Sequence, residues 1–242
     1  MTSSNPVLKD TTFRNVRELS GARMTAEGAV MKTAALLFLV VCSGAYTWQQ
    51  VSRGENFTPV MIAGVVGGLI ACLATVFKPN WAPISAPVYA LCQGLLMGAL
   101  SAVMQKQYPG IVLNAIGLTL GVLLIMLASY RLGWLRATPA FTRGVLCATG
   151  AIALFYLVTI VLRMFGVETP MLHDGGKLSI GISLVVVGVA ALNLILDFSV
   201  IEQGVEQGAP TYMEWYAAFG LLVTLLWLYV EILRLLSKLQ KR

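Results

Sequence analysis

Seven long apolar blocks recur along this chain, and they restrict its fold more than any other feature. A helix needs about 20 consecutive apolar residues to cross the hydrocarbon core of a bilayer. A soluble domain is typically about 25% charged, whereas this chain is 12% charged and 57% hydrophobic. We therefore expect an all-α polytopic membrane protein with a bundle of seven transmembrane helices. The predicted segments are Val30–Trp48, Pro59–Phe77, Ala86–Met104, Ile111–Tyr130, Gly144–Leu162, Leu178–Ile201 and Trp215–Leu236.

The first 29 residues are polar and include Lys9, Arg14, Arg17 and Arg23. A signal peptide would place a short apolar run and a small-residue cleavage site in this region. The first apolar run instead begins near Val30 and is long enough to span. We expect residues 1–29 to form a cytoplasmic N-terminal tail and residues 30–242 to form one transmembrane domain.

Basic residues are distributed unevenly between the two sides of the predicted bundle. Short cytoplasmic loops carry an excess of Lys and Arg, so the side with more of them is the inside. This predicts that the N-terminus is cytoplasmic. We expect the protein to lie in the inner (cytoplasmic) membrane of a cell. Nine basic residues share the side of the N-terminus (Lys9, Arg14, Arg17, Arg23, Lys32, Lys78, Arg131, Arg136 and Arg143) and four lie opposite (Arg53, Lys106, Arg163 and Lys177).

The seventh segment departs from this pattern, because four basic residues lie at its C-terminal end and the loop before it carries only acidic charges. If it spans fully, these cations lie outside; if it is re-entrant, the C-terminus can lie inside. Its length favours a full span, and the side of the C-terminus stays open. The four cations are Arg234, Lys238, Lys241 and Arg242.

Small residues recur every four positions in the third segment, at Ala90, Gly94, Gly98 and Ala102. Such a stripe lets helix backbones approach closely in lipid. It fits a tight bundle within one chain better than a dimer contact, so we expect a monomer.

Asp197 lies inside the sixth segment. A charge at this depth costs roughly 2.5–3.5 kcal/mol on insertion scales, so such residues are functional candidates. Asn193, Ser183 and Ser179 precede it at helical spacing, and this polar stripe would suit the wall of a hydrated cavity. The alternative is a carboxylate near the helix end that reaches the headgroups.

Glu231 lies late in the seventh segment, with Arg234 one turn later. One interpretation is a local Glu231–Arg234 pair, worth about 0.2–0.5 kcal/mol. The other joins Glu231 with Asp197 in one site. Two carboxylates in a low-dielectric site cannot both ionise cheaply, so they would share a proton.

Loss of a shared proton would force the two carboxylates apart or admit a cation. Hard cations such as Ca²⁺ prefer carboxylate and carbonyl oxygens. We therefore predict a proton- or cation-linked site at Asp197 and Glu231, with transient binding of Ca²⁺. Asn193, Ser183 and Gln93 are candidates for lining the pathway.

Catalytic chemistry is not expected, and neither is a cofactor. His173 is the single histidine and lies in a predicted loop, which excludes an HExxH zinc site and a Ser–His dyad at membrane depth. An aspartyl intramembrane protease would need two apposed aspartates, and Asp197 alone is available. The net charge of +6 is explained by topology, so nucleic acid is not an expected partner.

Four stretches carry a family resemblance: APVYALCQGLLMGALSAVM (Ala86–Met104), PGIVLNAI (Pro109–Ile116), ALNLILDFSVIE (Ala191–Glu202) and YMEWYAAFGLLVTLLWLYVEILRLL (Tyr212–Leu236). Together they resemble the bacterial branch of the Bax-inhibitor-1-like family, also called the transmembrane BAX inhibitor motif family. The resemblance runs through nearly all the chain after the tail, and the last two segments are its most specific part.

This resemblance implies a seven-helix bundle with the last helix near its centre. It also implies a pH-sensitive Ca²⁺ leak, gated by two acids in the sixth and seventh helices that share a proton. The first acid corresponds to Asp197 in LDFSVIE and the second to Glu231 in LWLYVEIL. The chain departs from the pattern in having Glu at the second position, a longer connection between the acids, and Gln93 where a Glu is expected.

Two functions follow as the main hypotheses. The first is a pH-sensitive Ca²⁺ or cation leak channel, whose partners are the bilayer, protons and Ca²⁺ or another cation. The alternative is a non-conducting regulator of a membrane-bound quality-control protease, because other bacterial relatives look like such modulators. Its docking element would be the tail, with Arg14, Arg17 and Glu18. A proton-coupled transporter ranks third, since no inverted repeat or pair of broken helices is evident.

Overall fold

The computed structural model describes residues 23–165 and 176–241. Within these residues it contains seven helices long and apolar enough to cross a membrane, and no β-strand. The predicted all-α polytopic fold is therefore confirmed. The helices are α2 (Ala26–Arg53), α3 (Thr58–Phe77), α4 (Ala82–Gln107), α5 (Ile111–Arg131), α6 (Pro139–Met164), α7 (Lys177–Glu206) and α8 (Tyr212–Gln240), and a 3₁₀ turn, η1 (Pro79–Trp81), precedes α4.

Most helices extend beyond the apolar segments that predicted them. α4 begins at Ala82 rather than Ala86. A proline lies in its first turn, where a backbone amide would have no partner within the helix, so the proline does not prevent the helix from starting there. α2 begins at Ala26, where the Thr25 hydroxyl accepts a 2.9 Å hydrogen bond from the amide of Gly28. Met24 is 3% exposed. Residues 23–29 thus belong to the bundle, and the rest of the predicted tail lies outside the described residues.

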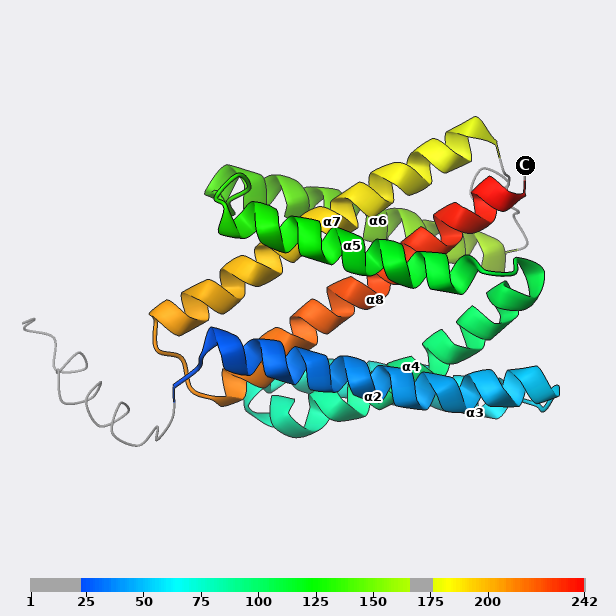
Figure 1. The fold of residues 1–242 in the computed structure, drawn as a ribbon, viewed down its shortest axis with the longest axis horizontal. Helices are drawn as coiled ribbons and strands as arrows, with labels where there is room; N and C mark the ends of the chain where they lie inside the picture. Colours follow the sequence, from blue (N-terminus) through cyan, green and yellow to red (C-terminus); the bar gives the residue numbers. More distant parts are fainter. Residues whose placement is uncertain (1–22, 166–175, 242) are drawn as a thin grey trace, which may run out of the picture.

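α8 runs through the middle of the bundle (Figure 1). On one side α2, α3 and α4 form a group, and on the other α5, α6 and α7 lie together. α8 packs against α2, α4, α5 and α7. Half of its most apolar stretch is buried, compared with 6% for α6 at the edge. The expectation of a central last helix is therefore confirmed.

The small-residue stripe of α4 packs against α2 in the same chain. A side chain at Gly98 would overlap the backbone of Gly44, and one at Gly94 would overlap Val40. The stripe therefore serves the bundle itself, as the sequence favoured. By contrast, a Cβ at Gly117 or Gly121 of α5 would have no neighbouring atom within 4 Å.

Outer faces of the bundle are strongly apolar, as contact with a lipid bilayer requires. Examples are Ile62 and Leu69 of α3 and Leu154 and Ile160 of α6, which are 56–61% exposed. The side of the membrane on which the N-terminus lies stays a prediction from the count of basic residues.

Candidate functional site

Asp197 lies in the contact between the antiparallel helices α7 and α8. Its Oδ1 faces Gly220 of α8 and is 3.9 Å from the position that a Cβ of residue 220 would take, an ordinary van der Waals distance. The Thr224 side chain lies beside the same carboxylate, one turn along α8. Oδ2 is buried and has no hydrogen-bond partner among the described residues. The predicted place of Asp197 in the wall of a hydrated cavity stays a prediction.

Glu231 lies farther along α8 and is 2% exposed. Its Oε1 accepts a 3.0 Å hydrogen bond from the Tyr156 hydroxyl of α6. Nη1 of Arg234 lies 3.2 Å from the same oxygen and donates a 2.6 Å hydrogen bond to the Tyr156 oxygen. The local Glu231–Arg234 pair considered from the sequence is thus present, and Tyr156 extends it to a second helix.

The structure does not bring the two carboxylates together. Ser183 is level with Lys238 across the α7–α8 contact, and Asp197 is level with Thr224. In this antiparallel register the α7 residue level with Glu231 is Ala190. Ala190 precedes Asp197 by seven residues, or about 10 Å of helix at 1.5 Å per residue. Each carboxylate therefore has its own set of neighbours.

The three candidate lining residues lie on different contacts. The side chain of Asn193 donates a 2.8 Å hydrogen bond to Thr149 of α6, whereas Ser183 faces α8. Gln93 of α4 lies against Gly68 of α3. The structure thus joins Ser183 and Asp197 along one helix contact, and places Asn193 and Gln93 elsewhere.

Lys238 is a buried cation that the sequence did not single out. It is 3% exposed, and its Nζ donates hydrogen bonds of 2.7 Å to the Ser183 hydroxyl and 3.2 Å to the Ser179 carbonyl. With Arg234 paired to Glu231, two of the four cations that made the seventh segment anomalous have partners inside the bundle. The spacing of residues 231, 234 and 238 on one helix face is the signal that could have revealed this.

A second buried ion pair lies at the opposite end of α8. Glu214 is 4% exposed and pairs with Lys32 of α2. Its Oε1 also accepts hydrogen bonds from the Thr25 amide at 2.8 Å and the Thr25 hydroxyl at 3.0 Å. The amide of Met24 donates a 2.7 Å bond to the carbonyl of Ala209. These contacts fasten the start of α2 to the connection between α7 and α8.

Among the described residues no three His, Cys, Asp or Glu side chains gather into a metal site. A bound Ca²⁺ takes about six to eight oxygen ligands. Asp197 and Glu231 are too far apart along the helices to contribute to one ion in this arrangement. His173, the single histidine, lies outside the described residues.

A family model described as "Bax inhibitor 1 like" matches residues 5–241, which is nearly the whole chain. The chain belongs to the Bax inhibitor 1 like family. No protein of curated function and no solved structure matches it. Family membership confirms the resemblance inferred from stretches of α4, α5, α7 and α8, and the bacterial branch stays a prediction.

The match to the Bax inhibitor 1 like family includes both helices that carry the candidate acids. Asp197 and Glu231 therefore lie within the matched range. The buried pairs of Glu214 with Lys32 and of Lys238 with Ser183 lie within the same matched range. The polar interior of this Bax inhibitor 1 like protein is concentrated on α8, which carries one partner of each side-chain hydrogen bond or ion pair between helices described above apart from Asn193–Thr149.

Proposed function

We propose that the protein is a pH-sensitive leak for Ca²⁺ or another cation, with Asp197 as its gate. The observation that carries this proposal is the buried Oδ2 of Asp197, which has no partner among the described residues. An uncompensated charge in a bundle interior is costly, and such residues mark ion or proton pathways in membrane proteins. The other buried acids, Glu214 and Glu231, each have a cation beside them.

The proton on Asp197 would control the contact between α7 and α8. When protonated, the carboxyl is neutral and fits between Gly220 and Thr224 with little cost. When the proton leaves, the carboxylate needs water or a cation, because a bare buried charge is strongly unfavourable. The α7–α8 contact then admits a hydrated cation. Flux should therefore rise as the pH rises.

In this proposal Glu231 has a different role from Asp197. Nη1 of Arg234 lies 3.2 Å from Oε1 of Glu231, so this carboxylate has a cation beside it. Glu231 then anchors α6 to α8 through Tyr156. In place of a shared proton, the proposal has two separate units: Asp197 of α7, which titrates, and Glu231 of α8, which holds α6 through Tyr156.

Flux measurements in liposomes test the proposal. Purified protein is reconstituted with an internal Ca²⁺ dye, and flux is followed from pH 6 to pH 8. Asp197→Asn fixes the side chain in its neutral form, so we expect low flux that no longer depends on pH. Glu206→Gln is the matched control, because Glu206 lies on the same helix and is exposed. A wild-type protein without flux, or an Asp197→Asn variant that keeps the wild-type profile, would overturn the proposal.

A second candidate function is regulation of a membrane-bound quality-control protease through the N-terminal tail. One observation favours it: an isolated bridge joins Arg23 to Pro210, so the tail leaves the bundle at a fixed point beside the α7–α8 connection. Arg14, Arg17 and Glu18, the predicted docking residues, lie outside the described residues. Deletion of residues 1–22 should abolish co-purification of a protease. A shortened protein that keeps its partners would count against this function.

A further inference from the structure

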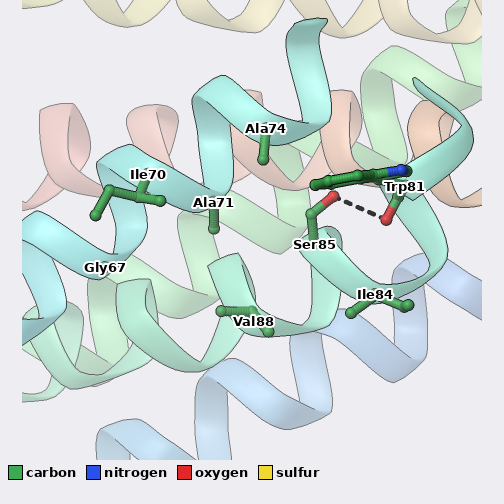
Figure 2. Close-up of a pocket in the computed structure, with 8 residues that line it drawn as sticks. All are labelled: Gly67, Ile70, Ala71, Ala74, Trp81, Ile84, Ser85 and Val88. Atoms are coloured by element: carbon green, nitrogen blue, oxygen red, sulfur yellow. Dashed lines mark hydrogen bonds between the residues drawn. The ribbon is translucent and has the colours of Figure 1, made fainter. Parts of the chain in front are cut away.

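A groove runs between α3 and α4 on the outside of the bundle. Its volume is about 520 Å³, within the range of roughly 300–1,000 Å³ that small-molecule sites occupy. Figure 2 shows its walls, with α3 on one side and α4 on the other. The walls include Gly67, Ile70 and Ala74 of α3, and Ile84 and Val88 of α4, with Trp81 at one end.

The groove is apolar and opens toward the surface that meets lipid. Ile70 and Ile84 on its two rims are 63% and 75% exposed. Its one polar side chain, Ser85, donates to the Trp81 carbonyl at 3.0 Å and lies 2.7 Å from the Thr75 hydroxyl, so its hydrogen-bonding capacity is used. The hollow exists because small residues stand on the α3 side. An alkyl chain would find only apolar surface there.

A cation lies at the Trp81 end of this groove. Nζ of Lys78 is 4.4 Å from the centre of the Trp81 ring, and Lys78 is exposed. Within the described part of the chain no carboxylate pairs with Lys78. The amino end of α4 is beside it, and the positive end of the helix dipole favours an anion. Trp at the end of a span is typical of the headgroup level of a membrane.

We propose that this groove is a binding site for an anionic phospholipid. One acyl chain would lie in the groove from Trp81 toward Gly67, and the phosphate would lie against Lys78 and the amino end of α4. Lys is a point-charge ligand for phosphate, and a basic residue near the surface attracts anionic lipid. The apolar groove supplies affinity for any acyl chain, and Lys78 supplies the preference for a negative headgroup. The site does not depend on ion conduction.

Native mass spectrometry of the purified full-length chain tests the site, with phosphatidylglycerol and phosphatidylcholine of the same acyl chains added separately. The wild type should retain phosphatidylglycerol more strongly. Lys78→Gln should lower phosphatidylglycerol binding about fivefold, the effect of one basic residue at a membrane surface, and leave phosphatidylcholine unchanged. Lys78 is exposed, so this variant should fold normally. Lys241→Gln, an exposed lysine at the end of α8, is the charge control.

A groove-filling variant tests the acyl-chain half of the site. Ala74→Phe places a ring in the cavity and should weaken both lipids, whereas Ala63→Phe, at an exposed position of α3 outside the groove, should weaken neither. Equal retention of the two lipids by the wild type would overturn the proposal. So would unchanged binding in Lys78→Gln, or a dimer that Ala74→Phe dissociates, because the groove would then hold a second copy of the chain.

Discussion

Nζ of Lys238 donates a 2.7 Å hydrogen bond to the hydroxyl of Ser183, and this contact fixes the register of α7 against α8. Fourteen residues separate Ser183 from Asp197 on α7, and the same number separates Thr224 from Lys238 on α8. A carboxylate at one end of the contact and an ammonium group at the other therefore each meet a hydroxyl residue of the facing helix. The two polar contacts lie about four helical turns apart along α7 and α8.

Removal of the Lys238 ammonium group should destabilise the bundle. Lys238→Met leaves the Ser183 hydroxyl without its donor in a buried position, and hydrogen bonds to charged groups contribute about 1.5–3 kcal/mol. We expect a loss of that size in the free energy of unfolding in detergent micelles. Ser183→Ala alone should also destabilise, because it leaves a buried charge with fewer partners.

The double variant distinguishes a direct contact from separate effects. Lys238→Met combined with Ser183→Ala should cost clearly less than the sum of the two single variants, because both members of the pair are then apolar. Strict additivity would show that the two residues do not interact. Lys241→Met, in the exposed last turn, should change stability by less than about 0.5 kcal/mol.

The Lys32–Glu214 pair should be much more sensitive than an exposed pair. Breaking a buried ion pair leaves an uncompensated charge and costs about 3–5 kcal/mol. The Lys32 side chain is 20% exposed, so Lys32→Met and Glu214→Gln should each lower the free energy of unfolding by an amount near the lower end of this range. Glu55→Gln is the control, because the Arg53–Glu55 pair is exposed and such pairs contribute about 0–1 kcal/mol. Equal losses in both pairs would contradict the buried position of Glu214.

Gly28 should tolerate no side chain, since a Cβ there would overlap the Glu214 carboxylate. Gly28→Ala should lower stability by about 1–3 kcal/mol, the usual cost of overpacking. Gly121→Ala in α5 is the matched control, with open space at the Cβ position. Its expected effect is a gain of about 0.5–1 kcal/mol, because Ala favours a helix more than Gly does. A gain of similar size in both variants would mean that helix propensity, not overlap, decides.

Apolar block length alone was sufficient to predict all seven helices and the membrane environment. The small-residue stripe of α4 also predicted a close helix contact correctly, and Gly98 meets Gly44 there. Local sequence contains these features, because a span needs a fixed number of apolar residues and close packing needs absent side chains. Helix ends were predicted less well, since turns outside the apolar run also join a helix: α2 begins at Ala26, before the predicted start at Val30.

Partner choice could not be predicted, because it depends on residues far apart in the sequence. Lys32 and Glu214 are 182 residues apart, and Ser183 and Lys238 are 55 apart. A count of basic residues by side of the membrane treats each of them as exposed to solvent. Lys238 was therefore grouped with the cations at the C-terminus, although it is buried. The depth of an acid along its helix was predictable, but its register against the facing helix was not. For this reason Asp197 and Glu231 were expected to meet, although the α7–α8 register separates them.

Tyr156 should be the residue that holds α6 on α8. α6 is the least buried helix, and it otherwise packs mainly on α7. The Tyr156 hydroxyl donates a hydrogen bond to Glu231 and accepts one from Arg234, so Tyr156→Phe removes two contacts with charged groups and keeps the ring. Hydrogen exchange of the α6 amides should become faster, because the local opening free energy falls by about 1.5–3 kcal/mol. Amides of α2 and α4 should be unaffected, since neither helix carries a residue of this cluster.

Tyr46→Phe is the control: Tyr46 is 55% exposed, and its hydroxyl accepts one bond from Gln50 within the same helix. Faster exchange over the whole bundle in Tyr156→Phe would show that the cluster supports global folding rather than the attachment of α6. Unchanged exchange in α6 would show that its contact with α7 is enough to hold it.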